Sequence, residues 1–86
     1  MPDMQQRFQQ AASDLKTLPS KPDSLTLLKL YALYKQGCLG DICVERPQGF
    51  DPVGQAKYNA WAELRGLSPD QAMGQYIEMV QSLLIR

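Results

Sequence analysis

The most informative absence in this 86-residue chain is histidine, which does not occur at all. Without histidine, a Ser–His–Asp triad, a Cys–His nucleophile pair and a histidine-ligated zinc site are all excluded. A net charge of one sign is absent too, because 9 Lys and Arg residues balance 9 Asp and Glu residues. A general nucleic-acid coat needs a basic excess to neutralise phosphates, so the charge balance argues against nucleic acid as the partner.

Cysteine is scarce, with Cys38 and Cys43 as the only two. Their spacing is not that of a C-x-x-C motif and no second pair accompanies them, so we predict no metal site. Secreted domains of this size usually carry several disulfides. That rule favours free thiols in a reducing compartment, with one small disulfide loop as the alternative. Cys38 follows an apolar helical stretch and is predicted to be a small core residue.

Long apolar runs are missing as well. No run approaches the roughly 20 residues of a membrane span. The polar, acidic residues at the N-terminus lack the apolar core of a signal peptide. We therefore expect a cytoplasmic protein without stable membrane insertion.

What the chain does contain is helical periodicity. Its length predicts one small domain over residues 1–86. Apolar residues recur at helical spacing in four stretches, about residues 3–18, 23–37, 52–66 and 69 to the end of the chain. Pro19, Gly37 and Gly66 are the expected ends of the first three. Ser68 and Gln71 predict a capping box before the fourth. Residues 37–51, which glycine and proline interrupt, predict a long loop. The expected fold class is all-α, a four-helix bundle with this loop between helices 2 and 3.

Lysines within or beside apolar helical faces are the candidate binding residues. Lys57 interrupts the apolar stripe of the third helix, where it either extends its ammonium to water over Trp61 or Leu64, or forms an anion site. Tyr31 and Lys35 lie one turn apart on the second helix, where both can reach one phosphate. For this pair, a solvated rim is an equal alternative.

For three further polar residues the sequence favours a structural role over ligand binding. Tyr76 is predicted to be a core tyrosine with its hydroxyl at the surface, with ligand contact as the alternative. Lys16 is predicted to be a solvated helix end. Arg46 is predicted to pin the long loop through a salt bridge to Glu45 or Asp41. No set of residues has the spacing of a catalytic site or of a Gly-rich phosphate loop, so an enzyme is not expected.

Five strings of residues resemble the acyl-CoA-binding protein family. They are YALYKQ at residues 31–36, GDI at 40–42, ERP at 45–47, GQAKYNAW at 54–61 and LRG at 64–66. The pairs at 72–73 and 76–77 continue the similarity, which covers nearly the whole chain without a gap. The resemblance implies a single acyl-CoA-binding domain with its helices in up-down-down-up order.

The resemblance also implies a function. It indicates a cytoplasmic monomer that binds medium- to long-chain fatty acyl-CoA such as palmitoyl-CoA with high affinity, as a carrier and pool former without chemistry and without a cofactor. Carried over to this sequence, it assigns the 3′-phosphate of the CoA ribose to Tyr31, Lys35 and Lys57. Around the adenine it assigns Ala12, Lys16 and Tyr34, with Tyr76 at the nucleotide end. Leu28 and Tyr58 are assigned to the acyl chain.

Some residues depart from the family pattern. Tyr58 stands where a second tryptophan is common, and Val53 stands where a lysine often contacts CoA. In place of a lysine-rich tail, the sequence ends with Leu84-Ile85-Arg86, so that the C-terminal helix is expected to end on apolar residues. The alternative function is a helical protein–protein interaction module that keeps the fold without the ligand. The two are distinguished by whether Lys16, Lys35 and Lys57 converge on one groove, because separation onto different faces would remove the main support for the carrier.

Overall fold

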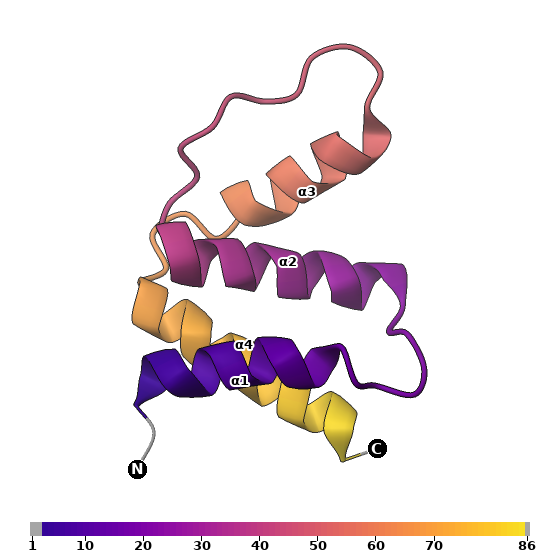
Figure 1. Cartoon of the computed structure of the whole chain (residues 1–86). Helices are drawn as coiled ribbons and strands as arrows, with labels where there is room; N and C mark the ends of the chain where they lie inside the picture. The colour runs from indigo at the N-terminus through magenta and orange to yellow at the C-terminus, as the bar shows by residue number, and fades with distance from the viewer. Residues whose placement is uncertain (1–2, 86) are drawn as a thin grey trace.

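The computed structural model describes residues 3–85 and contains four helices. They are α1 (Met4–Leu15), α2 (Ser24–Leu39), α3 (Pro52–Ala62) and α4 (Pro69–Leu84). The described residues contain no strand. Helices α1 and α4 run in one direction along the molecule, and α2 and α3 run in the other (Figure 1). The all-α fold in up-down-down-up order is therefore confirmed, as is the long loop between α2 and α3.

Each helix begins at a short polar side chain that accepts a hydrogen bond from a backbone N–H of the first turn. These N-caps are Asp3, Asp23, Asp51 and Ser68. The capping box predicted before α4 is present, because Ser68 and Gln71 bond to each other's backbone N–H groups. The starts of the helices are thus set by local sequence.

The ends of the first three helices differ from the prediction. Helix α1 stops at Leu15 and continues only as a turn, so Pro19 does not end it. Helix α2 passes through Gly37 and ends at Leu39, with Gly40 at a φ of 78° as its C-cap. Helix α3 ends at Ala62, and a turn leads on to Gly66.

Gly37 has a packing role instead of a terminating one. A Cβ atom at this position would lie 3.0 Å from Cζ of Phe8 and 3.1 Å from Cγ of Met73. Its missing side chain therefore leaves room for the side chains of Phe8 from α1 and Met73 from α4.

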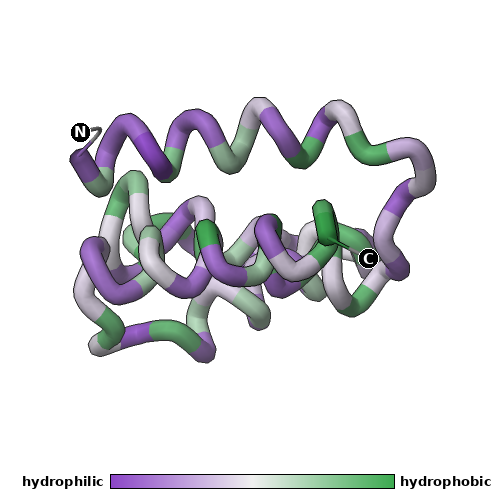
Figure 2. The backbone as a smooth tube through the Cα atoms, turned by 90° about the horizontal axis from the view of Figure 1, so that it is seen from below, coloured by the Kyte–Doolittle hydropathy of each residue, from purple (hydrophilic) through white to green (hydrophobic). Residues whose placement is uncertain are grey.

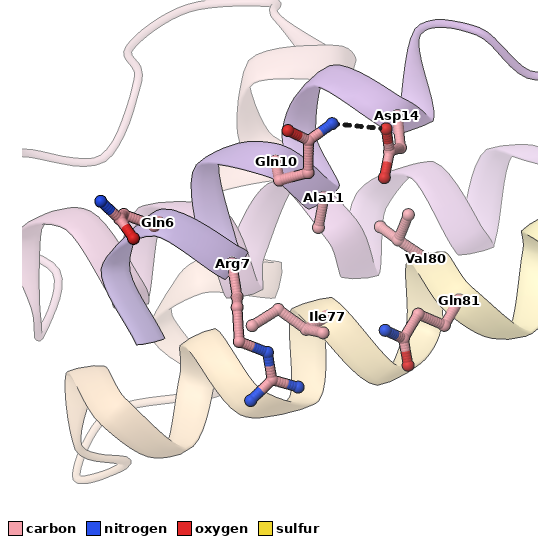
Figure 3. Close-up of a pocket in the computed structure, with 8 residues that line it drawn as sticks. All are labelled: Gln6, Arg7, Gln10, Ala11, Asp14, Ile77, Val80 and Gln81. Carbon is pink, nitrogen blue, oxygen red and sulfur yellow. Dashed lines mark hydrogen bonds between the residues drawn. The ribbon is translucent and has the colours of Figure 1, made fainter. Parts of the chain in front are cut away.

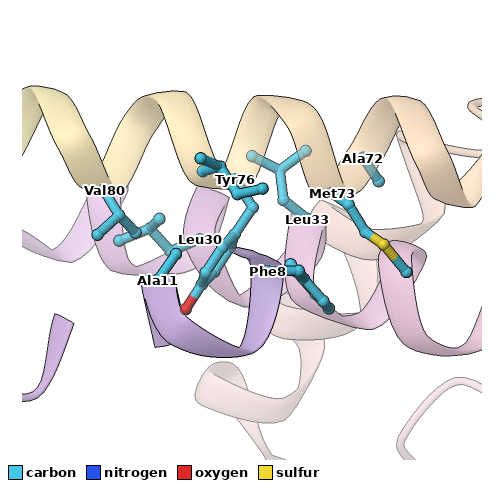
Figure 4. Close-up of a cluster of buried hydrophobic side chains, with 9 residues drawn as sticks. Phe8, Ala11, Leu30, Leu33, Ala72, Met73, Tyr76 and Val80 are labelled. Carbon is cyan, nitrogen blue, oxygen red and sulfur yellow. The ribbon is translucent and has the colours of Figure 1, made fainter. Parts of the chain in front are cut away.

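The hydrophobic core lies between α1, α2 and α4 (Figure 4). It consists of Phe8, Ala11, Leu30, Leu33, Ala72, Met73, Tyr76, Ile77 and Val80. Along α1 the hydropathy alternates between hydrophilic and apolar segments, as expected of an amphipathic helix (Figure 2). Among the described helices, α3 packs against α2 and against neither α1 nor α4. It forms a separate layer on α2 (Figure 1), so any site between α2 and α3 lies outside the main core.

A buried glutamine ties this outer layer to the bundle. Gln36 is 0% exposed. Its Nε2 donates to Oδ1 of Asp41 at 2.9 Å and to the carbonyl of Leu67 at 2.7 Å. Its Oε1 accepts from Nε1 of Trp61 at 3.1 Å, and the same indole N–H donates to the carbonyl of Gly40 at 2.9 Å. One side chain thus joins α2 to the loop, to α3 and to the turn before α4.

Asp41 is held in its ionised form by this network. The backbone N–H of Gly66 donates to Oδ1 of Asp41 at 2.9 Å. This bond, the bond from Gln36 and the nearby charge of Arg65 together hold the pKa of Asp41 below its usual value.

Candidate functional site

A groove of about 370 Å³ runs between α2 and α3. Its lining residues are Ser24, Leu27, Leu28 and Tyr31 from α2, and Pro52, Val53, Ala56 and Lys57 from α3. Most of these side chains are apolar, and none of the eight is acidic. The groove explains why α2 is apolar around most of its circumference. Leu30 and Leu33 face the core, while Leu27 and Leu28 face the groove.

Two ammonium groups gather on one aromatic ring beside this groove. Nζ of Lys57 lies 5.3 Å from the ring centroid of Tyr31, and Nζ of Lys35 lies 5.8 Å from the same centroid. Cations are attracted to the negative face of an aromatic ring at such distances. Lys35 comes from α2 and Lys57 from α3, so the positive charge is concentrated where the two helices meet. This cluster of Tyr31, Lys35 and Lys57 has the donors that a phosphate requires.

Lys57 is an exposed residue, and its ammonium lies over Tyr31 of the neighbouring helix. A periodic pattern within one helix contains no signal for a partner on another.

Tyr34 and Tyr76 belong to an aromatic cluster with Phe8. The ring centroids of Phe8 and Tyr34 are 5.1 Å apart in a stacked arrangement, and Tyr76 meets Phe8 edge-on at 5.1 Å. The centroids of Tyr34 and Tyr76 are 5.7 Å apart. Burial raises the pKa of the Tyr76 hydroxyl, and the neighbouring Tyr34 and Cys38 raise it further. Tyr76 is a core tyrosine, and its hydroxyl points toward α1 (Figure 4).

Two other candidates lie on α1. Ala12 is partly buried and packs against the core. Lys16 is the exposed C-cap residue of α1 and is not among the residues that line the α2–α3 groove. Lys35 and Lys57 thus share one aromatic partner, whereas Lys16 stands apart from them.

The two candidates for the acyl chain are placed differently. Leu28 lines the groove, whereas Tyr58 is not among its lining residues. The Tyr58 ring is covered by the guanidinium of Arg46, whose Cζ lies 4.7 Å from the ring centroid. Arg46 also donates to Oδ1 of Asn59 at 2.8 Å and to Oε1 of Gln55 at 3.2 Å. Arg46 does pin the loop, but onto α3 rather than through Glu45 or Asp41.

Some features of the site were missed from the sequence. Ser24, Leu27, Pro52 and Ala56 line the groove, and their helical spacing around Tyr31 and Lys57 was the available signal. Both cysteines are free, as predicted, and both are exposed. Cys38 is therefore not a core residue, because it lies in the last turn of α2 on the surface.

A second hollow of about 380 Å³ lies between α1 and α4 (Figure 3). Polar side chains surround a buried floor of Ala11, Ile77 and Val80. At its rim, Nε2 of Gln10 donates to Oδ1 of Asp14 at 2.8 Å. No candidate binding residue lines this hollow, whereas Leu28, Tyr31 and Lys57 all line the α2–α3 groove.

Comparison with known proteins gives a consistent result. The family model described as acyl CoA binding protein matches residues 5–80. The chain is 44% identical over 79 residues to acyl-CoA-binding protein homolog 1 of Caenorhabditis elegans, covering 92% of both chains. It is 40% identical over 81 residues to the acyl-CoA-binding protein of Fritillaria agrestis, covering 94% of this chain and 93% of that one.

Solved structures agree with this similarity in sequence. The crystal structure of acyl-CoA-binding protein 2 of Oryza sativa superposes with a TM-score of 0.91 at 36% identity, covering 96% of this chain and 92% of that one. The structure from Moniliophthora perniciosa gives a TM-score of 0.85 at 31% identity, covering 92% of this chain and 78% of that one. The chain therefore belongs to the acyl-CoA-binding protein family.

Proposed function

We propose that this protein binds medium- to long-chain fatty acyl-CoA thioesters in the α2–α3 groove and acts as a non-enzymatic intracellular carrier and pool former. The observation that carries the proposal is the convergence of Lys35 and Lys57 on Tyr31, beside an apolar groove without acidic lining residues. An acyl-CoA has the same two chemical parts, an anionic nucleotide head and an apolar tail.

In this proposal the cluster of Tyr31, Lys35 and Lys57 holds the 3′-phosphate of the CoA ribose. The two ammonium groups and the Tyr31 hydroxyl supply charge-assisted hydrogen bonds, which are roughly twice as strong as neutral ones. These bonds distinguish an acyl-CoA from a free fatty acid of the same chain length. Ala12, Lys16, Tyr34 and Tyr76 surround the adenine end in this proposal.

The acyl chain supplies most of the affinity. Burying a methylene group is worth about 0.8 kcal/mol, so a fully covered palmitoyl chain contributes up to ~12 kcal/mol. Part of this is lost to association entropy and chain ordering. With the head-group contacts added, a net of about −10 to −12 kcal/mol, equivalent to nanomolar affinity, is consistent with the groove. Leu28 lines this part of the groove, and Tyr58 is proposed to flank it.

Calorimetric titration with palmitoyl-CoA tests the assignment. Lys35→Ala, Lys57→Ala and Tyr31→Phe should each weaken binding by about tenfold or more, because each removes a hydrogen bond to a charged group worth about 1.5–3 kcal/mol. Lys29→Ala is the matched control, since Lys29 is an exposed lysine of α2 that does not line the groove.

If Lys35→Ala, Lys57→Ala and Tyr31→Phe all bound palmitoyl-CoA as tightly as the wild type, the phosphate assignment would be refuted. A wild-type protein that binds no acyl-CoA would refute the carrier and favour the interaction module.

A further inference from the structure

The loop between α2 and α3 has no backbone hydrogen bonds of its own. Among the described residues, no backbone N–H or carbonyl of residues 41–50 takes part in a backbone–backbone hydrogen bond. The network at Asp41 fixes the start of the loop, and Asp51, the N-cap of α3, fixes its end. Hydrogen bonds that hold the middle of the loop must therefore involve side chains.

Arg46 makes most of these contacts. Its guanidinium lies over the Tyr58 ring, with Cζ 4.7 Å from the ring centroid. The same group donates to Oδ1 of Asn59 at 2.8 Å and to Oε1 of Gln55 at 3.2 Å. Gln55 completes the arrangement, because its Nε2 donates to the carbonyl of Pro47 at 3.0 Å. We call Arg46, Gln55, Tyr58 and Asn59 the loop clamp.

The loop clamp holds α3 from the side away from the α2–α3 groove. Its two amides, Gln55 and Asn59, lie one helical turn apart. Val53 and Lys57, which line the groove, also lie one turn apart. With 3.6 residues per turn, the two pairs lie on nearly opposite sides of α3, and Tyr58 lies between them. Helix α3 is accordingly enclosed between α2 and the loop (Figure 1).

The first half of α3 has few other attachments. Among the described helices, α3 packs only against α2. Within residues 52–62 Trp61 alone is buried, and its hydrogen bonds to Gln36 and Gly40 fix the last turn of the helix. All four groove-lining residues of α3 fall within residues 52–57, before this anchor. The loop clamp thus acts on the part of α3 that forms the wall of the groove.

We propose that Arg46 is a positioning residue for the ligand, which holds the first half of α3 against α2 and so fixes the width of the groove. This rests on the proposed function, because it assigns a role at the same site. Arg46 does not line the groove, so it acts through α3. Loss of the clamp lets α3 move away from α2, which separates Lys57 from Tyr31 and admits water beside the acyl chain. A planar guanidinium is required, because it covers a ring and bonds two amide oxygens at once.

Palmitoyl-CoA titration of Arg46 variants tests this role. Arg46→Ala should lower the affinity by about fivefold or more, mainly through faster dissociation, because it removes the ring contact and both hydrogen bonds. Adding Asn59→Ala should lower the affinity no further, because the two residues share one contact. Arg46→Lys keeps the charge but not the fork of donors, so it should bind as weakly as Arg46→Ala. Arg65→Ala is the matched control, since it removes the same charge from an exposed arginine outside the clamp and should bind like the wild type.

Amide hydrogen exchange of the ligand-free protein gives a second measurement, which does not depend on acyl-CoA binding. In Arg46→Ala, exchange should be about fivefold faster or more in the first half of α3 and unchanged in α1 and α4. Equal acceleration in all three helices would overturn the proposal, because it would mean a general loss of stability. So would wild-type affinity in Arg46→Ala, or wild-type affinity in Arg46→Lys, which would mean that only the charge matters. A wild type that binds no palmitoyl-CoA, with faster exchange in α3 of Arg46→Ala, would instead overturn the proposed function and leave the clamp.

Discussion

The buried side chain of Gln36 gives the sharpest prediction for stability. Replacing it with leucine keeps a similar volume but removes the amide that bonds three partners. Trp61 keeps a hydrogen bond to the Gly40 carbonyl, and Asp41 keeps the N–H of Gly66. The carbonyl of Leu67 loses the bond from Gln36. The variant therefore leaves one backbone acceptor without that partner and removes all three hydrogen bonds by which Gln36 joins α2 to the loop, to α3 and to the turn before α4.

The size of the effect follows from the hydrogen bond that the carbonyl of Leu67 loses. A buried polar group left without a partner costs about 1–3 kcal/mol, whereas an apolar replacement of the same shape otherwise costs little. We expect Gln36→Leu to lower the free energy of unfolding by about 2 kcal/mol, which is roughly 8–16 °C in Tm for a domain of this size.

Urea denaturation followed by far-ultraviolet circular dichroism measures this change. Trp61 is the only tryptophan of the chain and takes part in the network, so its fluorescence should shift in the native variant as well. Gln75→Leu is the matched control, because Gln75 is an exposed glutamine of α4, and it should change stability by less than about 0.5 kcal/mol. If Gln36→Leu were as stable as Gln75→Leu, the network would not be what holds α3 to the bundle.

The remaining predictions concern substitutions of two glycines and the dependence of stability on acidic pH. Gly37→Ala should lower stability by about 1–3 kcal/mol, because its Cβ would lie 3.0 Å from a core ring. Gly74→Ala, where a Cβ meets nothing within 4 Å, should raise stability by about 0.5–1 kcal/mol in the same melting experiment. The pKa of Asp41 is lower in the folded state, so its stabilising contribution is present above the unfolded pKa of about 3.9 and is lost as pH falls through the folded value. The free energy of unfolding should therefore fall more steeply below about pH 4 in the wild type than in Asp41→Asn, and parallel pH curves would contradict this.

Local signals made the helix starts predictable from sequence. Asp51 followed by proline, and Ser68 with Gln71, act within a single turn, and the structure has both. The end of α2 was not predictable in this way. Gly37 and Gly40 are equal candidates for a C-cap, and only the contacts of Gly37 with α1 and α4 distinguish a packing glycine from a terminating one.

The candidate site likewise has a part that could be predicted from sequence and a part that could not. Tyr31 and Lys35 were paired from their spacing, because one helical turn separates them and both lie on α2. Their meeting with Lys57 depends on how α3 packs on α2, and only the family resemblance pointed to it. The partners of Arg46 could not be predicted for a similar reason, because Asn59 is brought near only when the loop folds back over α3.

Binding of a fatty acyl-CoA in the α2–α3 groove can be tested residue by residue. The ¹⁵N-labelled protein is titrated with palmitoyl-CoA while the backbone amide shifts are followed. We expect the largest shift changes in α2 and α3 around Leu28, Tyr31 and Lys57, with little change around Gln10 and Gln81 at the α1–α4 hollow. Changes centred on that hollow, or no changes at saturating ligand, would show that the groove is not the binding site.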